Sequence, residues 1–361
     1  MHNILSIKEK IKPGILSEHY NEHSHGGRLI EIAKKYNIPL SDWIDLSTGI
    51  NQNGYPVPDI PKSVWNRLPE NNDELNKIAA RYYQCDSLIA VAGSQVAIQM
   101  IPTFFSKKTV GLIQPGYYEH AKHWIKQNHT IINFQHKPSN TLDSNLALIR
   151  EINNKIHLLD ALIIINPNNP SGLCFSKQQL LQWHKILIKR HAYLIIDEAF
   201  MDTDNTNSLL SSTLLPNLVI LRSIGKFFGL AGIRLGFIFS NKIILDKISE
   251  IQGPWPISGP SRWIACKALS DNNWQNKTRS MLRKNSIRLK FLLTQYQLIP
   301  CGGTDLFQWV RTSHAEEIYH RLNQQGILTR LFSDPDSLRF GIPKDESQWE
   351  KLEQALHICI K

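Results

Sequence analysis

The chain has few cysteines, no long apolar run and no excess of acidic residues. Its five cysteines are scattered over 361 residues without a C-x-x-C pair, so neither a zinc knuckle nor a disulfide framework is indicated. The first ten residues lack the apolar core of a signal peptide, and no later apolar run is long enough to cross a bilayer. We therefore expect a soluble cytoplasmic protein with no membrane partner.

Positive charge is in excess, since 41 lysines and arginines face 31 acidic residues and give a formal net charge of +10. A basic balance can reflect nucleic-acid binding. Here the basic residues are spread along the chain, and no zinc-finger, RNA-recognition or heptad pattern accompanies them. We expect no nucleic-acid partner, and either a site for phosphorylated substrates or a solvated surface explains the charge.

The order of apolar segments predicts two domains. Residues 60–240 alternate short apolar strands with helical stretches, which is typical of an α/β domain with a mainly parallel sheet. Beyond residue 240 long amphipathic helices are followed by short strands, which indicates a small α+β domain. We predict an N-terminal arm over 1–55 that joins the small domain, a large domain over 56–240 and a small domain over 241–361.

The segment Arg222–Gly236 carries the strongest chemical signal. Lys226 follows Ser223, precedes Arg234, and has the apolar neighbours Phe227 and Phe228. Desolvation and a nearby cation lower the pKa of a lysine, so its amine can act as a nucleophile and form a Schiff base with a cofactor. The plainer alternative is a lysine at a helix start in a glycine-rich loop. The glycine spacing is not that of a P-loop.

Two upstream segments support the first interpretation. A buried-looking strand that ends at Ile165 leads into the loop Asn166–Gly172, and the next strand ends at Asp197. The carboxyl ends of neighbouring parallel strands meet at the edge where α/β sheets bind ligands. Alone, each polar residue would be a turn asparagine or a capping aspartate, but together with Lys226 they form a candidate site.

In this order the segments resemble the fold-type I pyridoxal-phosphate enzymes, the class I and II aminotransferases. The resemblance implies a large domain with a mainly parallel sheet, a small α+β domain, and pyridoxal 5'-phosphate as cofactor. It implies that Lys226 binds the cofactor covalently and that Asp197 pairs with the ring nitrogen. Asn169 would bind the ring oxygen. Phe200 stands where many relatives have a tyrosine, and this difference removes one hydrogen bond to that oxygen.

The resemblance also implies which residues surround the rest of the cofactor. Either Tyr117 or His120 would stack on the ring, and His120 is slightly favoured. Members of the family usually form homodimers, and Tyr55 would reach the neighbour's cofactor phosphate unless it packs in its own proline-rich turn. The residues implied at the phosphate within one chain are Gly93, Ser94, Gln95, Ser223 and Arg234.

Two arginines in the small domain bear on the substrate. Arg339 matches the arginine with which the family binds an α-carboxylate, and a strand-edge arginine in a surface ion pair is the alternative. Arg330 stands where histidinol-phosphate aminotransferases and their kin bind the substrate's phosphate. A small phosphorylated amino acid is therefore the expected substrate.

The N-terminal part narrows the choice. The segments His25–Arg28, Trp43–Asn51 and Gly54–Pro58 resemble the opening of the threonine-phosphate decarboxylases of cobalamin biosynthesis. These enzymes use the cofactor to convert L-threonine O-3-phosphate into (R)-1-amino-2-propanol O-2-phosphate. The residues implied at the substrate are His25, Gly26, Gly27, Asn169, Arg330 and Arg339.

Two other functions remain open. A histidinol-phosphate aminotransferase or a related aminotransferase is the main alternative, because the same residues serve both reactions, and a non-catalytic binding module is the other. His19, His23 and His25 could be read as a metal cluster, but no carboxylate or cysteine accompanies them at ligand spacing, so we expect no metal.

Overall fold

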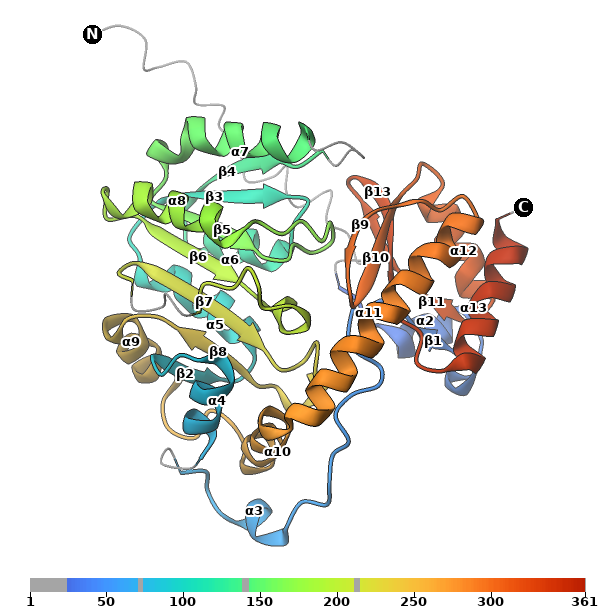
Figure 1. Ribbon diagram of the computed structural model, residues 1–361, viewed down its shortest axis with the longest axis horizontal. Coiled ribbons are helices and arrows are strands. Elements are labelled where there is room, and N and C mark those ends of the chain that lie inside the picture. Colours follow the sequence, from blue (N-terminus) through green and yellow to red (C-terminus); the bar gives the residue numbers. More distant parts are fainter. Residues whose placement is uncertain (1–24, 71–73, 138–142, 211–214, 361) are drawn as a thin grey trace, which may run out of the picture.

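The computed structural model describes residues 25–70, 74–137, 143–210 and 215–360. His19, His23 and the first part of the predicted N-terminal arm lie outside this range. Figure 1 shows two lobes, each built around its own β-sheet, with the long helix α11 (Asn272–Gln295) running from one to the other. None of the described helices is both long enough and apolar enough to cross a membrane.

A seven-stranded sheet forms the centre of the large domain. Five neighbouring strands run parallel, and at one edge β8 pairs antiparallel with both β7 and the outermost strand β2. The expected α/β class with a mainly parallel sheet is confirmed. In spatial order the strands are β2 (Leu88–Val91), β8 (Gly236–Phe239), β7 (Leu218–Ser223), β6 (Tyr193–Asp197), β5 (Ala161–Ile165), β3 (Thr109–Gln114) and β4 (Thr130–Gln135).

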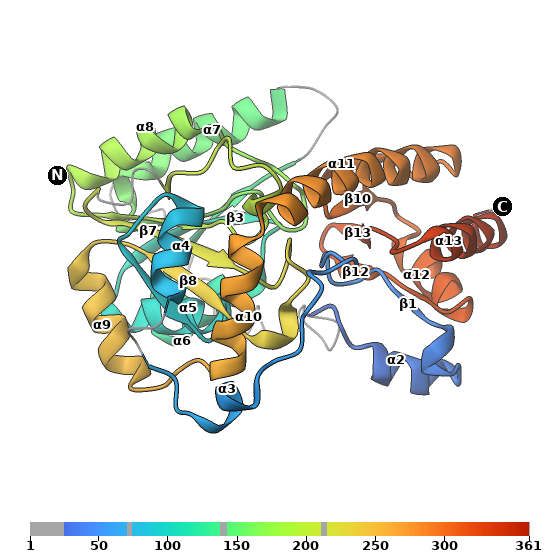
Figure 2. The same ribbon diagram turned by 60° about the horizontal axis from the view of Figure 1, so that its bottom comes forward.

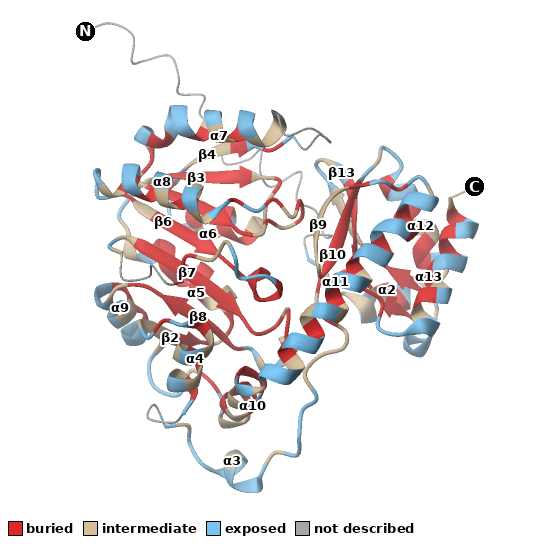
Figure 3. Ribbon diagram, viewed as in Figure 1, coloured by how far each residue is buried: buried red, intermediate tan, exposed pale blue. Residues whose placement is uncertain are grey.

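Helices cover both faces of this sheet, so its central strands are buried on both sides (Figures 2 and 3). This explains why these strands are continuous apolar runs rather than alternating ones. Alternate residues of β6 belong to different cores, with Ile196 on one face and Ile195 on the other. One face packs against α4 (Leu75–Tyr83), α7 (Asp143–Lys155), α8 (Lys177–Ile188) and α10 (Gly259–Ser270), and the other against α5 (Ser94–Met100), α6 (Tyr118–Lys126) and α9 (Lys242–Gln252).

The small domain is built on a four-stranded antiparallel sheet. The N-terminal segment joins it, because β1 (Ile44–Asp45) pairs in parallel with β11 (Ile327–Leu328) and α2 (Leu29–Tyr36) packs into the same core. The remaining elements are β9 (Pro300–Thr304), β10 (Phe307–Arg311), β12 (Arg330–Ser333), β13 (Asp336–Gly341), α12 (Ala315–Gln324) and α13 (Glu346–Cys359).

Packing moves the predicted boundary at residue 240 toward the C-terminus. Ile244 and Ile248 of α9 lie in a large-domain core, and α10 packs against α4 of the same domain. Helix α11 then crosses between the cores, with Leu282 in the large domain and Leu289 in the small one. Amphipathicity alone could not locate the boundary, because it does not say which sheet a helix covers.

Candidate active site

A cavity of about 630 Å³ lies between the two domains, at the carboxyl ends of β5, β6 and β7. Parallel strands place their end loops together at this edge, where open α/β sheets bind ligands. Of the residues expected at the cofactor or substrate, the cavity wall contains His25, Gly26, Ser94, Gln95, Tyr117, Asn169, Asp197, Ser223, Lys226, Arg234, Arg330 and Arg339.

Lys226 lies in the loop after β7 and extends into this cavity. Burial, with a contribution from the positive charge of Arg339, lowers the pKa of Lys226 to about 8. Its Nζ donates a hydrogen bond to the carbonyl of Thr48 at 3.4 Å and lies 5.4 Å from the centre of the Phe200 ring. A substantial fraction of this amine is therefore neutral near pH 8 and can attack a carbonyl carbon.

Asp197 ends β6 opposite Lys226, and its two oxygens are held differently. Oδ1 accepts the backbone N–H of Ala199 at 3.0 Å, and Oδ2 lies 3.0 Å from Nε2 of His120. Only 2% of His120 is exposed and it does not line the cavity, whereas Tyr117 does. The geometry favours Tyr117 over His120 as the stacking ring, because the His120 ring contacts the carboxylate, whereas Tyr117 is one of the aromatic residues of the wall.

The guanidinium of Arg234 lies against the backbone of Gly93, at the side of the cavity where an anionic group could bind. Gly93 has a φ of +82°, and a Cβ there would lie 2.5 Å from Nη2 of Arg234, so glycine lets the guanidinium lie against the backbone. Gln95 has committed its side chain, because its amide donates to Glu119 at 2.6 Å and its oxygen accepts the Tyr117 hydroxyl at 3.1 Å.

Arg330 and Arg339 are directly opposite each other on the antiparallel strands β12 and β13, and both face the cavity. Within the described chain, no carboxylate lies within ion-pair distance of either. Arg339 donates instead to Oδ1 of Asn169 at 2.5 Å and to the carbonyl of Ser47 at 2.6 Å. Burial lowers the pKa of Arg339 to about 9 and that of Arg330 to about 10, so both stay cationic at neutral pH.

The other expected residues lie at the margin of the cavity or away from it. His25 is in the wall, with Nε2 3.2 Å from Oε1 of Glu119. Gly27 lines a small adjoining cavity with Arg330. Tyr55 does not line the cavity of its own chain. Its ring packs edge-on against Trp274, with 5.3 Å between the ring centroids.

Sequence reasoning missed a buried ion cluster directly behind the site. Arg222 lies 2.9 Å from both Glu198 and Asp202, and all three side chains are at most 1% exposed. Glu198 follows Asp197 and Arg222 precedes Ser223, so strand alternation sends the cluster to the opposite face. The sequence did contain a signal for this ion pair, because an acidic residue stands next to Asp197 and a basic residue next to Ser223 at the ends of neighbouring strands.

The sequence also missed Thr48, which the N-terminal segment brings into the cavity wall, and Asp45 and Ser47, which form a turn just outside that wall. Their signal was weak, because Asp45 and Ser47 act through a turn rather than through a motif. Among the described residues, no group of three or more histidine, cysteine, aspartate and glutamate side chains could hold a metal ion.

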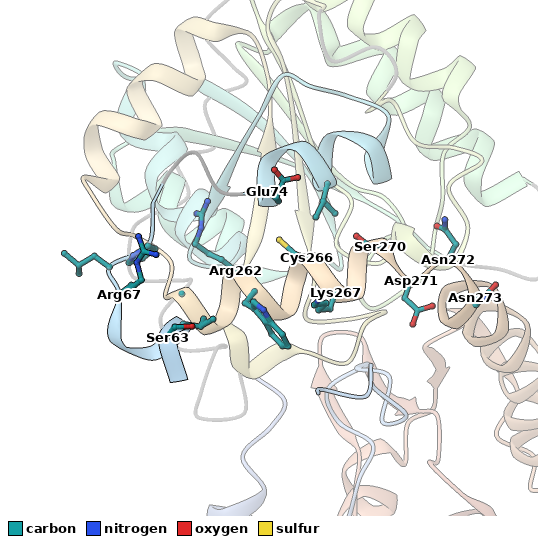
Figure 4. A pocket seen from close by; sticks show the side chains of 16 residues that line it. Ser63, Arg67, Glu74, Arg262, Cys266, Lys267, Ser270, Asp271, Asn272 and Asn273 are labelled. Atoms are coloured by element: carbon teal, nitrogen blue, oxygen red, sulfur yellow. The ribbon is translucent and has the colours of Figure 1, made fainter. Parts of the chain in front are cut away.

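A second hollow, of about 990 Å³, lies on the large domain between α3 (Lys62–Asn66), α4, α10 and the start of α11 (Figure 4). Its wall contains Trp263, Cys266 and Asp271 but none of the residues expected at cofactor or substrate. Large apolar side chains adjoin it in sequence and are strongly exposed, with Trp65 at 62%, Leu68 at 64% and Trp255 at 55%. We call this feature the α10 groove.

Comparison with known proteins agrees with the geometry. The family model described as aminotransferase class I and II matches residues 43–356. A threonine-phosphate decarboxylase from Pseudomonas aeruginosa is 41% identical to the chain, over 92% of the chain and 96% of that protein. A histidinol-phosphate aminotransferase from Buchnera aphidicola (Acyrthosiphon pisum) is 29% identical, over 80% of the chain and 81% of its own length.

A solved structure shares the fold. The histidinol-phosphate aminotransferase of Sinorhizobium meliloti, determined in complex with pyridoxal 5'-phosphate, superimposes with a TM-score of 0.76. The match covers 98% of each chain at 17% identity.

Proposed function

Because the chain belongs to the class I and II aminotransferase family, we propose that it is a pyridoxal-phosphate-dependent decarboxylase of L-threonine O-3-phosphate. The product is (R)-1-amino-2-propanol O-2-phosphate, and the pathway is cobalamin biosynthesis. A histidinol-phosphate aminotransferase is the second candidate, and its support is weaker, since the relative of that name is 29% identical over 80% of the chain.

The residues of the cavity fit pyridoxal 5'-phosphate. Lys226 would bind its aldehyde carbon, Asp197 would face the ring nitrogen, and Tyr117 would cover the ring. The glycine at position 93, where any Cβ would strike Arg234, leaves a cradle for the phosphate beside that guanidinium. When bound, the cofactor supplies an electron sink that weakens the bonds at the substrate's Cα. Asp197, kept in place by His120, favours the ring form with a protonated nitrogen.

The observation that carries the substrate assignment is the cross-strand pair Arg330 and Arg339, for which the described residues supply no carboxylate partner. Like charges opposite each other on neighbouring strands repel, so this arrangement is stable when an anion lies between or beside them. A phosphorylated amino acid has two such groups, its carboxylate and its phosphate. We assign the carboxylate to Arg339, next to Asn169, and the phosphate to Arg330 with the His25–Gly27 loop.

These anchors decide the reaction through orientation. By fixing the carboxylate and the phosphate, Arg339 and Arg330 set which bond at Cα lies in the position that the bound cofactor weakens. When that is the bond to the carboxylate, carbon dioxide would leave, and Lys226 Nζ would return a proton to Cα. When it is the bond to hydrogen, Lys226 removes the proton and transamination follows.

The test separates these outcomes. Purified holoenzyme receives carboxyl-labelled L-threonine O-3-phosphate without an oxo acid, and a parallel sample receives histidinol phosphate with 2-oxoglutarate. Release of labelled carbon dioxide supports the decarboxylase, whereas retained label with glutamate formation in the second sample establishes the aminotransferase. Borohydride reduction must also fix the cofactor on Lys226, and failure to do so would refute both enzymatic proposals.

We also propose that two copies pair through the α10 groove. The exposed Trp65, Leu68 and Trp255 would be covered there, which relieves a large apolar exposure. Tyr55 supports this, because it is turned away from its own cavity and lies near Asp271 of the groove, whose charge adds to burial in raising the pKa of Tyr55. From the partner it would reach the neighbouring cofactor phosphate. The five free cysteines suit work in a reducing cytoplasm.

A further inference from the structure

A short turn in the N-terminal segment, Asp45–Ser47, lies between the small domain and the cavity. Oδ1 of Asp45 accepts both the backbone N–H of Ser47, at 2.8 Å, and its hydroxyl, at 2.6 Å. Ser47 is 2% exposed. The carboxylate thus fixes the direction of the Ser47 hydroxyl proton, and with it the direction of the remaining oxygen lone pairs.

Ser47 contacts both of the parts that we assign to the substrate's anionic groups. Its Oγ accepts the backbone N–H of Gly27 at 2.9 Å, and its carbonyl accepts Nη2 of Arg339 at 2.6 Å. The loop lies directly on Ser47, because a Cβ added to Gly26 would come within 2.5 Å of the Ser47 carbonyl oxygen. One residue therefore joins the His25–Gly27 loop to the arginine on β13.

The kind of contact matters as much as its place. A carboxylate beside Arg339 would orient the guanidinium but also neutralise it, and an anionic substrate would then compete with that partner. The carbonyl of Ser47 and the amide oxygen of Asn169 orient the guanidinium while they leave its charge available. Asp45 forms no direct ion pair with Arg339 and holds Ser47 through the turn, while its charge only partly offsets the burial that lowers the pKa of Arg339.

We propose that Ser47, oriented by Asp45, is a positioning residue that sets Arg339 and the His25–Gly27 loop as one anion-binding unit. The identity of the natural anion rests on the proposed function, but the positioning role does not. It predicts that loss of the turn weakens the binding of phosphorylated ligands and leaves cofactor binding at Lys226 intact, since neither Asp45 nor Ser47 lines the cofactor cavity.

The test compares Ser47→Ala, Asp45→Ala and Asp45→Asn with a matched control. Asp204 and Thr206 form the same turn outside the cavity, because Oδ1 of Asp204 accepts both the N–H of Thr206 at 3.0 Å and its hydroxyl at 2.5 Å. Thr206→Ala therefore removes an equivalent hydroxyl without touching the site. Holoenzymes are titrated with L-threonine O-3-phosphate and with inorganic phosphate, followed by cofactor absorbance, and KM, kcat and cofactor Kd are measured.

We expect Ser47→Ala and Asp45→Ala to raise the KM and Kd for both ligands about 10-fold, as is usual for a lost hydrogen bond next to a charged group. Cofactor Kd should stay at the wild-type value and kcat should change little. Asp45→Asn, which keeps an acceptor oxygen, should restore most of the affinity, and Thr206→Ala should match wild type.

The proposal is overturned if Ser47→Ala binds both ligands as tightly as Thr206→Ala, or if cofactor affinity falls in parallel with ligand affinity. It is also overturned if Asp45→Asn is as impaired as Asp45→Ala. If wild-type holoenzyme does not turn over L-threonine O-3-phosphate, the proposed function fails, and the titrations with inorganic phosphate still decide the role of Ser47.

Discussion

Lys226 combines burial with nearby positive charge, and this combination lowers the pKa of its amine to about 8. The same environment has a thermodynamic consequence, because the folded pKa of about 8 lies well below the value of 10.5 for a free lysine. Folding therefore opposes protonation of this amine. Burial of the protonated amine lowers the free energy of unfolding of the cofactor-free protein, and this loss disappears when the amine becomes neutral.

Replacement of Lys226 by methionine in the cofactor-free protein should remove this loss. Below pH 8 lysine is protonated in both the folded and the unfolded chain, so the variant should have the larger free energy of unfolding, by up to about 3 kcal/mol. Between pH 8 and 10.5 the unfolded wild-type chain binds more protons, so wild-type stability rises and the difference closes. Urea denaturation of both proteins from pH 7 to 10.5 measures it, and a constant difference would contradict the lowered pKa.

Substitutions at Tyr117 and His120 can show which of the two side chains stacks on the cofactor ring. If Tyr117 covers the cofactor, Tyr117→Phe should keep near wild-type cofactor affinity, and Tyr117→Ala should weaken it about 10-fold. His120→Phe keeps a ring but removes the nitrogen 3.0 Å from Asp197, so it should also weaken binding. The measurement is cofactor Kd by absorbance. Tolerance of both Tyr117→Ala and His120→Phe would show that His120 is the stacking ring.

The ends of β6 and β7 carry the site on one face and a buried ion cluster on the other. Glu198 donates its backbone N–H to the carbonyl of Leu221 at 2.9 Å, which continues the ladder between these strands beyond Asp197. Its carboxylate then meets Arg222 at 2.9 Å. Helix α11 joins the cluster through Arg279, whose Nε donates to the carbonyl of Asp202 at 3.0 Å. On the face away from the site, the ends of β6 and β7 are therefore fixed by the sheet's own hydrogen bonds and by α11, the helix that connects the two domains.

Arg222→Met should be strongly destabilising, because it leaves Glu198 and Asp202 buried without their cation. We expect the free energy of unfolding to fall by about 3–5 kcal/mol. Lys242→Met, which removes an exposed ion pair of 2.8 Å with Asp246, is the control and should cost less than about 1 kcal/mol. Urea denaturation at pH 7 compares the two. Equal effects would mean that the cluster contributes no more than a surface pair.

The whole molecule places Lys226, Asp197 and Arg234 on one domain and the arginines Arg330 and Arg339 on the other, and all five line the cavity between the domains. The proposed pairing through the α10 groove would add a residue of a second copy, Tyr55. Such an arrangement makes the dimer, rather than the single chain, the unit that holds two complete sites.

Mixed dimers test this arrangement. Tyr55→Ala and Lys226→Ala each inactivate a homodimer if Tyr55 acts on the partner's cofactor. After mixing, about half of the dimers are hybrids, and each has one complete site of two, so about a quarter of wild-type activity should return. Activity after subunit exchange, with sedimentation to verify the dimer, measures it. No recovery in verified hybrids would place Tyr55 in its own chain's structure instead.

Much of the site was accessible from the sequence because its chemistry is local. Lys226, Asp197 and Asn169 sit where apolar strands end, and parallel strands end at a common edge, so their convergence followed from strand order. The choice between Tyr117 and His120 did not follow from the sequence. Both lie at the start of α6, and which of the two side chains points into the cavity depends on how that helix packs on the sheet. The sequence also could not show which sheet α9 and α10 cover, because their pattern reveals an apolar face but not its partner.

The apolar strand pattern, the order of the polar strand ends and the lysine loop were sufficient to predict the α/β class and the family. These features depend on residues near one another in the chain. The tertiary structure alone decided that Arg330 and Arg339 are opposite each other with no carboxylate partner among the described residues, that Arg222 pairs with Glu198 behind the site, and that Ser47 links Gly27 to Arg339. Each of these contacts joins segments far apart in sequence, so its geometry and its electrostatics exist only once the sheets have packed.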